Sequence, residues 1–355
     1  MKKTACYEVH RKLGGKIVDF AGWALPIQFE GILKEHEIVR TKCGIFDCSH
    51  MGQVFVKGEK TLDFFQKLIS NNIEKIPDGK AIYSGMLNEK GGFVDDLIVY
   101  RISSTEAMAV INASNIEKDV AWMEKVIQES GYDLSLEDRS DQMGLLALQG
   151  PSSPEFLNKV LGLDLSEIKR FGFATLNYQG SEGYICRTGY TGEEGVELVF
   201  PNDVMPMLLN AFVESGVAPC GLGARDSLRL EKGYSLYGHE IDDTTNAIEA
   251  GLSWTVDLGK DDFIGKGALE EVKAKGATRK MVGFQMEGRA MARQGDLVVD
   301  QDGQDIGVVT SGTFSPTLKV GIGLAYVPSS FDTETLNLKV RKKVLPATVV
   351  TRNFI

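Results

Sequence analysis

Short apolar runs alternate with short helical stripes along the chain, which indicates a protein that mixes α and β structure. In residues 16–29 Gly22 and Pro26 interrupt dense apolar positions, so we expect short strands and turns there rather than a helix. In residues 58–73 a stripe at helical spacing predicts a helix with one buried face, and this stripe consists of Leu62, Phe65 and Ile69.

Residues 81–113 are typical of extended structure. Two apolar runs, 81–87 and 92–100, flank Asn88-Glu89-Lys90-Gly91-Gly92, whose glycines permit positive φ, so the pattern predicts a hairpin. A third strand is expected at 107–113.

A helix is predicted over residues 114–130. Ser114 and Glu117 have the spacing of a capping box, and Gly131 provides a stop. The apolar stripe of this helix consists of Ile116, Val120, Met123 and Ile127.

The pattern restarts at Met143 with a strand, a Gly-Pro turn and a helix, and a strand at 198–200 precedes a helix at 205–214. Residues 281–350 differ in character, because short apolar runs are separated there by Asp-Gly, Ser-Pro and Lys-rich turns. Such spacing favours a small β-barrel or sandwich as a separate C-terminal domain.

The composition excludes several classes of protein. A chain of 355 residues exceeds one ordinary core, and 43% hydrophobic with 25% charged residues is a globular balance. The net charge of −10 argues against a nucleic-acid partner, and no apolar stretch approaches the roughly 20 residues of a membrane span. The N-terminus lacks the apolar core of a secretory signal, so we expect a cytoplasmic protein. Five cysteines without a CxxC predict reduced thiols and no metal site.

Two adjacent carboxylates interrupt an apolar run in GGFVDDLIVY, which predicts a buried strand. Because neighbouring residues of a strand point to opposite faces, Asp95 and Asp96 cannot share one pocket, and only one of them is expected to be catalytic. The alternative is that a buried carboxylate here satisfies backbone donors. Periodicity does not choose between the two residues.

Two further segments carry candidate polar groups. In RTGYTGEEGVEL three glycines predict a tight loop that presents Arg187, Tyr190 and Glu197, although the loop lacks the spacing of a phosphate-binding motif; the alternative is a surface turn. GLGARDSLRLEKGYSLYGHEID predicts a glycine turn and a helix, and its charges would otherwise form solvated ion pairs, above all Asp226 with Arg229.

Seven colinear segments together resemble the glycine cleavage T-proteins over nearly the whole chain. They are GIFDCSHMG, MLNEKGGFVDDLIVY, LLALQGP, RTGYTGEEGVEL, GLGARDSLRLEKGYSLYG, GLSWTV and TSGTFSPTL. The family uses tetrahydrofolate to take the methylene carbon from an aminomethyl group on the lipoyl arm of the H-protein. Ammonia and 5,10-methylenetetrahydrofolate are formed. The resemblance thus implies tetrahydrofolate as co-substrate and the lipoylated H-protein as partner.

The resemblance also assigns roles to residues of this chain. The second aspartate of the pair, Asp96, would be catalytic, while Glu197 would bind the pterin edge with Arg225 beside it. The other positions expected to line the folate cavity are Met51, Tyr83, Tyr100, Asn112, Tyr190 and Trp254. Arg293 resembles a basic position that holds the glutamate tail of folate or shapes the H-protein entrance; a plain surface arginine is the alternative.

The implied fold is α+β, with three domains arranged as a cloverleaf around a central folate cavity. Residues 1–52 with 138–275 would form the folate-binding domain, 53–137 a second domain carrying Asp96, and 276–355 a C-terminal barrel. Two rival functions share this fold: a folate-dependent demethylase with another donor, and a non-catalytic folate-binding protein. The second carries a cysteine in a Lys-Gly-Cys-Tyr motif, where this chain has Lys232-Gly233-Tyr234-Ser235.

Overall fold

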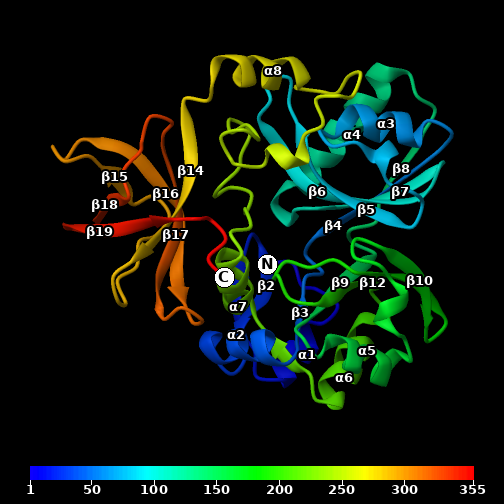
Figure 1. Cartoon of the computed structure of the whole chain (residues 1–355). Helices are drawn as coiled ribbons and strands as arrows, with labels where there is room; N and C mark the ends of the chain where they lie inside the picture. The colour runs from blue at the N-terminus through cyan, green and yellow to red at the C-terminus, as the bar shows by residue number, and fades with distance from the viewer. The chain divides into compact units, whose positions relative to one another are not determined.

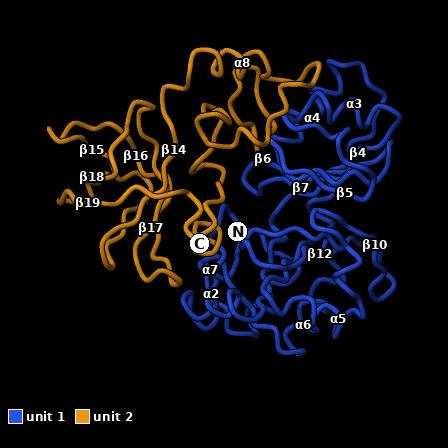
Figure 2. Tube along the Cα trace, viewed as in Figure 1, with its two compact units in different colours: residues 1–84, 96–225 blue, residues 85–95, 226–355 orange.

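The computed structural model describes all 355 residues, and they group into two compact units. Unit 1 comprises residues 1–84 and 96–225, and unit 2 comprises residues 85–95 and 226–355 (Figure 2). The finer division into three domains expected from the sequence stays a prediction.

Unit 1 contains a six-stranded sheet whose centre is built from nearly continuous apolar strands. The strand order is β10-β11-β12-β9-β3-β13, and β13 joins β3 in parallel while the other neighbours are antiparallel. Its strands are β3 (Gly44–Asp47), β9 (Met143–Gln149), β10 (Phe173–Tyr178), β11 (Ser181–Cys186), β12 (Gly195–Pro201) and β13 (Ala218–Cys220).

A second, five-stranded sheet has the order β5-β6-β7-β4-β8. It consists of β4 (Gly52–Lys57), β5 (Lys80–Leu87), β6 (Phe93–Ser103), β7 (Glu106–Ile111) and β8 (Ser135–Asp138). The predicted hairpin and third strand are therefore confirmed as β5, β6 and β7. At the hairpin turn Gly91 adopts φ 81°, as expected for a glycine that permits left-handed backbone.

The remaining elements of unit 1 are a short hairpin, six helices and three 3-10 turns. The hairpin is β1 (Lys16–Phe20) with β2 (Trp23–Gln28), as the punctuated N-terminal pattern predicts. The helices are α1 (Tyr7–Lys12), α2 (Ile32–Thr41), α3 (Thr61–Leu68), α4 (Ile116–Ser130), α5 (Ser153–Leu161) and α6 (Met205–Ser215). The 3-10 turns are η1 (Ile73–Lys75), η2 (Ala113–Asn115) and η3 (Leu165–Glu167).

The predicted helix over 114–130 is confirmed as α4, but its capping box is wrong. The chain enters α4 through the 3-10 turn η2, and Asn115 at the N-cap makes no side-chain capping bond. The fully buried face is Asp119, Met123 and Val126, so packing covers only one edge of the predicted stripe. Periodicity identifies the apolar side of a helix, while the neighbouring elements decide which part of it leaves water.

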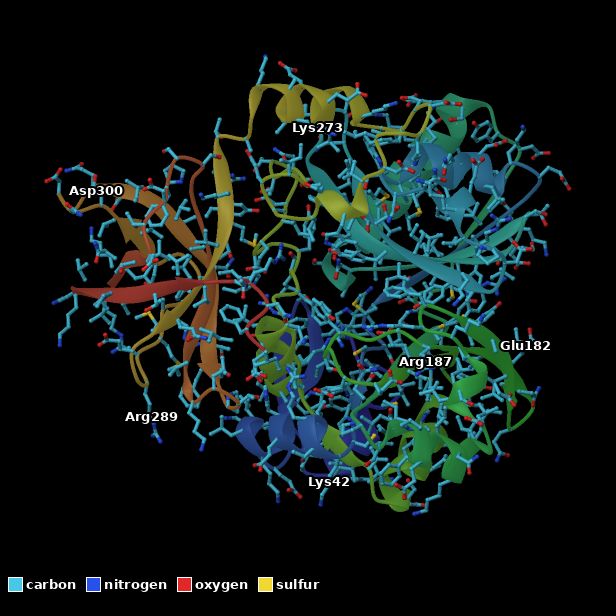
Figure 3. The ribbon with its side chains drawn as sticks, in the orientation of Figure 1. Lys42, Glu182, Arg187, Lys273, Arg289 and Asp300 are labelled. Carbon is cyan, nitrogen blue, oxygen red and sulfur yellow. The ribbon has the colours of Figure 1, made fainter.

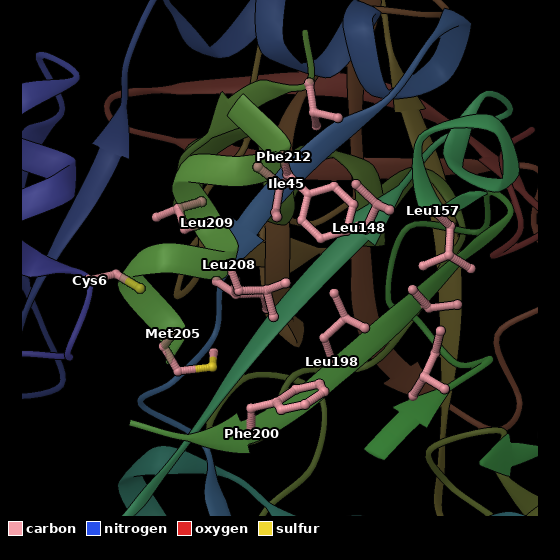
Figure 4. Packing of buried hydrophobic residues seen from close by; sticks show 14 of the residues in the cluster. Cys6, Ile45, Leu148, Leu157, Leu198, Phe200, Met205, Leu208, Leu209 and Phe212 are labelled. Atoms are coloured by element: carbon pink, nitrogen blue, oxygen red, sulfur yellow. The ribbon is translucent and has the colours of Figure 1, made fainter. Parts of the chain in front are cut away.

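The main core of unit 1 lies between α6 and the six-stranded sheet (Figure 4). Met205, Leu208 and Phe212 of α6 are fully buried, and they belong to one cluster with Leu148 of β9 and Leu198 of β12. Gly216 ends α6 in the left-handed conformation, which is the usual helix stop.

Unit 2 is dominated by a closed antiparallel barrel with the order β14-β17-β16-β15-β18-β19, so the predicted C-terminal barrel is confirmed (Figure 1). Its strands are β14 (Arg279–Met286), β15 (Leu297–Val299), β16 (Asp305–Ser315), β17 (Val320–Pro328), β18 (Thr335–Val340) and β19 (Lys343–Val350). Before the barrel come α7 (Leu222–Glu231), whose first turn belongs to unit 1, η4 (Ser253–Thr255) and α8 (Lys266–Lys275).

Arg229 of α7 is buried, whereas its segment predicts a solvated ion pair. It is the largest fully buried side chain, 1% exposed, and its Nη1 donates to Glu240 at 3.0 Å. Its Nε binds Asp226 at 2.9 Å and its Nη2 binds the Ser311 hydroxyl of β16 at 2.8 Å. Sequence spacing reveals the exposed partner Asp226, whereas Glu240 and Ser311 are brought in only by folding.

Asp47 at the end of β3 forms a second buried polar cluster, in unit 1. It accepts hydrogen bonds from the Thr4 hydroxyl at 2.6 Å and the Ser49 backbone at 2.9 Å, and it lies 2.7 Å from His10 Nε2. Burial acts to raise the pKa of Asp47, but these hydrogen bonds and the His10 charge lower it to about 2.

None of the helices is both long and apolar enough to cross a bilayer. All five cysteines are buried and unpaired. No three His, Cys, Asp or Glu side chains gather closely enough to hold a metal ion.

Removing the negative charge of Asp47 should destabilise the protein at neutral pH and much less in acid. The pKa of Asp47 is depressed from about 4 in the unfolded chain. The carboxylate therefore contributes stability above pH 4 that is lost as the pH falls through 2. We expect Asp47→Asn to lower the free energy of unfolding by about 2–3 kcal/mol at pH 7. Urea midpoints of both proteins at pH 7 and near pH 2.5 check this, and an equal difference at the two pH values would contradict it.

Arg229→Met should destabilise the protein by about 3–5 kcal/mol, because it leaves the Glu240 carboxylate buried without its cationic partner. The matched control is Lys275→Met, which removes one member of an exposed helical pair with Glu271 and should leave stability unchanged. Urea unfolding measures both. A loss of stability no greater than that of the control would show that the buried Arg229–Glu240 pair contributes nothing to stability.

Candidate functional site

Asp96 on β6 lies at the centre of a compact polar cluster. The Tyr83 hydroxyl of β5 donates to its Oδ2 at 2.8 Å, and the Asn112 amide donates to its Oδ1 at 2.8 Å and to its backbone oxygen at 3.1 Å. Both carboxylate oxygens are thus held, one by a donor on β5 and the other by a residue that directly follows β7. The side chain is half-buried, whereas Asp95 is fully buried and belongs to the opposite face of the strand. The different burial of the two aspartates is consistent with the strand rule that places them on opposite faces.

The same face of β6 connects Asp96 with a second carboxylate. Residues 96, 98 and 100 share one face, so the backbone of Tyr100 lies about 13 Å along the strand from Asp96. The Tyr100 hydroxyl is 3.0 Å from the Thr188 hydroxyl, which donates to Glu197 Oε2 at 2.5 Å. Glu197 sits on the central strand β12 and is 8% exposed. A hydroxyl bridge therefore joins the two sheets of unit 1 beside this carboxylate.

The groups around Glu197 are neutral acids that stay protonated. Burial raises the pKa of Cys48 to about 12, and the Glu197 charge adds to that effect while Arg225 opposes it. Burial, aided by the nearby Glu197 charge, also raises the pKa values of Cys186 and Tyr100 well above their ordinary range. Neither thiol is available as a thiolate nucleophile at neutral pH.

Tyr190 and Arg225 come together from two separate segments. The Arg225 guanidinium lies over the Tyr190 ring, 4.8 Å from its centroid, a cation–π arrangement. Tyr190 is carried by the loop between β11 and β12, which folds over Gln149 at the end of β9. The Gln149 side chain accepts from Thr191 at 2.8 Å, and a Cβ at Gly189 would lie only 2.1 Å from it. The loop of the RTGYTGE segment therefore packs directly against Gln149 of the LLALQGP segment.

Two buried polar atoms in this region have no hydrogen-bond partner: Nη1 of Arg225 and Nδ1 of His50. His50 is 3% exposed, and the Phe20 ring contacts it edge-on at 5.6 Å. Burial lowers the pKa of His50 to about 4, and the Arg225 charge lowers it further, so the imidazole is neutral at physiological pH. Buried polar atoms without partners are rare, and they mark a place where a bound group or water can add hydrogen bonds.

The structure gives less information about the role of three other predicted positions. Met51 follows His50 and is half-buried in the turn between β3 and β4. Trp254 and Arg293 belong to unit 2, where Trp254 is 65% exposed and Arg293 donates to the Gly312 backbone oxygen at 3.0 Å. Their role in the site stays a prediction.

Arg187, which the sequence offered as a possible ligand contact, instead supports the fold. It donates to the backbone oxygens of Leu165 and Ile168 at 3.2 and 2.8 Å and pairs with Glu194 at 2.6 Å. Figure 3 shows its side chain within unit 1, while the charged residues Lys42 and Glu182 project from the outside of that unit.

Sequence reasoning missed Thr188, Gln149 and His50. Thr188 and Glu197 belong to the same segment, RTGYTGEEGVEL, so the motif could have indicated that the two residues lie close together. His50 is a buried histidine whose Nδ1 has no hydrogen-bond partner, and no local motif around it indicates this state. His239 Nδ1, by contrast, lies 3.1 Å from the Thr310 backbone oxygen.

Comparison with known proteins covers the whole chain. The family model of the GCVT N-terminal domain matches residues 6–260, and that of the glycine cleavage T-protein C-terminal barrel domain matches residues 279–355. The chain is 45% identical over 361 residues to an aminomethyltransferase of Halothermothrix orenii, covering 100% of both chains. It is 48% identical over 329 residues to that of Chlorobium luteolum, covering 91% of this chain and 89% of the relative.

A solved structure agrees with these matches. The glycine cleavage system aminomethyltransferase T of Bartonella henselae superposes with a TM-score of 0.94 at 35% sequence identity, covering 100% of this chain and 98% of that one. Both family domains, full-length relatives and the fold thus point the same way. The chain belongs to the glycine cleavage T-protein family, that of the aminomethyltransferases.

Proposed function

We propose that this protein is the aminomethyltransferase of a glycine cleavage system. It transfers the methylene carbon from the S-aminomethyldihydrolipoyl group of an H-protein to tetrahydrofolate. The products are 5,10-methylenetetrahydrofolate, ammonia and the dihydrolipoyl H-protein. The observation that carries the proposal is the pair of carboxylates Asp96 and Glu197 in unit 1, which occupy distinct hydrogen-bonded settings linked along one face of β6.

The residues present fit tetrahydrofolate. The pyrimidine edge of a pterin carries adjacent N–H donors, and the Glu197 carboxylate is an acceptor that has only the Thr188 hydroxyl as its hydrogen-bond donor. Nη1 of Arg225 and Nδ1 of His50 are also buried without partners, so a bound ligand or its water can complete their hydrogen bonds. Bound tetrahydrofolate supplies the nitrogen atoms that accept the one-carbon unit.

Asp96 is suited to act on that transfer through its charge. With Oδ1 and Oδ2 held by Asn112 and Tyr83, the carboxylate has a fixed direction before substrate arrives. A preorganised negative charge orients an attacking N–H and stabilises positive charge that develops as ammonia leaves. No nucleophilic role is needed. Much of the rate would come from positioning two bulky reactants together.

The donor of the one-carbon unit is proposed to be the lipoylated H-protein, and the site of action the cytoplasm. Relatives named aminomethyltransferase at full coverage support the proposed transfer reaction.

Asp96→Asn should lower kcat by about 10²–10⁴-fold and leave the folate Kd within a factor of about three, because the amide keeps the shape and loses the charge. Tetrahydrofolate and aminomethylated H-protein are the substrates, and methylenetetrahydrofolate and ammonia are followed. Asp133→Asn, an exposed carboxylate of unit 1, is the control and should match wild type. Full activity of Asp96→Asn would remove the catalytic role. An inactive wild type that binds folate would favour another donor or a binding protein.

Glu197→Gln should raise the Kd for tetrahydrofolate by about 10–100-fold, since it replaces charge-assisted hydrogen bonds to the pterin edge by neutral ones and adds a competing donor. Calorimetric titration measures the effect. Glu182→Gln removes an exposed carboxylate from the adjacent strand β11 and should leave the Kd unchanged. Equal affinity in Glu197→Gln and wild type would place the pterin elsewhere.

A further inference from the structure

Helix α2 contributes no residue to the proposed folate site, yet it contacts both segments that carry the Tyr190–Arg225 stack. Glu35 and Arg40 make these contacts. They are five residues apart, so they lie about 7.5 Å apart along the helix axis and about 140° apart around it. One helix thus reaches in two directions within unit 1.

Glu35 anchors the start of α7. Its carboxylate is 1% exposed, and Oε1 accepts three backbone N–H bonds, from Phe29, Glu30 and Gly31, at 2.6, 2.9 and 3.0 Å. Oε2 accepts the N–H of Gly221 at 2.8 Å. Because a carboxylate with four backbone donors is strongly bound, Gly221 is held at a defined place on α2.

The glycines of the GLGAR segment make this anchoring close. A Cβ at Gly221 would lie 2.4 Å from the backbone of Ile27, and one at Gly223 would lie 2.5 Å from the Ile32 side chain at the start of α2. Only glycine allows such an approach. Arg225 follows in the same helical turn, with its N–H donating to the Gly221 oxygen at 3.2 Å. The place of Gly221 therefore sets the place from which Arg225 projects.

Arg40 holds the other half of the stack. Its Nη1 donates to the backbone oxygen of Thr191 at 2.6 Å and to Glu193 Oε1 at 2.9 Å. The Arg40 side chain is 10% exposed, so this pair is largely shielded from water. Thr191 is the residue after Tyr190. Arg40 therefore fixes the loop directly beside the tyrosine ring that receives Arg225.

We propose that Glu35 and Arg40 are positioning residues for the folate site, which α2 assembles by holding Arg225 with one residue and Tyr190 with the other. The proposal rests on the proposed function, since the stack is taken to be part of the folate site. It assigns to α2 a role in ligand affinity rather than in chemistry. Loss of either anchor should raise the Kd for folate while sparing kcat at saturation.

Arg40→Met is the deciding variant, with Lys34→Gln as the control, because Lys34 is an exposed residue of the same helix that pairs only with Glu30. Calorimetry with tetrahydrofolate should show a Kd raised about tenfold in Arg40→Met and unchanged in the control. With folate and H-protein saturating, kcat should stay within a factor of about three.

The same substitution in a Tyr190→Ala background separates positioning from general support of the fold. If Arg40 acts by placing Tyr190, Arg40→Met should change the Kd less than about twofold once the ring is gone. An equal factor in both backgrounds, or wild-type affinity of Arg40→Met, would overturn the proposal. Failure of the wild type to bind folate would instead overturn the proposed function.

Glu35→Gln tests the second anchor in the same titration and should also raise the Kd. The double variant Glu35→Gln/Arg40→Met should raise the Kd by less than the product of the two single factors, because both residues act on the same Tyr190–Arg225 stack. A fully multiplicative result would show that the two residues act independently, against the proposal. If Glu35→Gln does not fold, the Arg40→Met comparison alone decides.

Discussion

A carboxylate that leaves water must be met by hydrogen-bond donors, because an unpaired buried charge costs several kcal/mol. Three such groups organise this protein, and each has at least one hydrogen-bond partner that is remote in sequence. Glu35 binds the backbone of Gly221, and Asp47 binds Thr4 and His10. In unit 2, Glu231 of α7 accepts hydrogen bonds from Ser315 and Thr317 of the TSGTFSPTL segment. Much of the tertiary structure consists of the segments that these requirements bring together.

The Glu197 carboxylate of the site differs from the Glu35 carboxylate in how many hydrogen bonds it accepts. Glu35 accepts four backbone hydrogen bonds, whereas Glu197 accepts only one, from Thr188. Arg225 and His50 each bury a nitrogen atom without a partner. Saturated carboxylates stabilise the fold, and unsaturated ones beside an uncompensated guanidinium can bind a polar ligand. The contrast explains why buried charges in one chain serve two purposes.

The local pattern identified most elements and part of the site. The β5–β6 hairpin, the helix α4 and the C-terminal barrel follow from alternation, helical spacing and turn residues, which act over a few positions. The strand rule also separated Asp95 from Asp96. Resemblance to the family then singled out Asp96, Glu197 and Arg225. The expected pair of Arg229 with Asp226 forms, but Arg229 is buried rather than solvated, and folding adds Glu240 and Ser311 as further partners.

By itself the sequence determined the periodicities, the glycine positions and the chemical types of the functional groups, because these are properties of single residues and near neighbours. Tertiary structure alone decided which groups are satisfied and which are not. The neutral state of His50 depends on burial and on the Arg225 charge. The Tyr190–Arg225 stack depends on two contacts of α2, with residues that are 151 and 186 positions away in the sequence. Burial and long-range hydrogen bonds exist only after the chain has folded, so no local pattern encodes them.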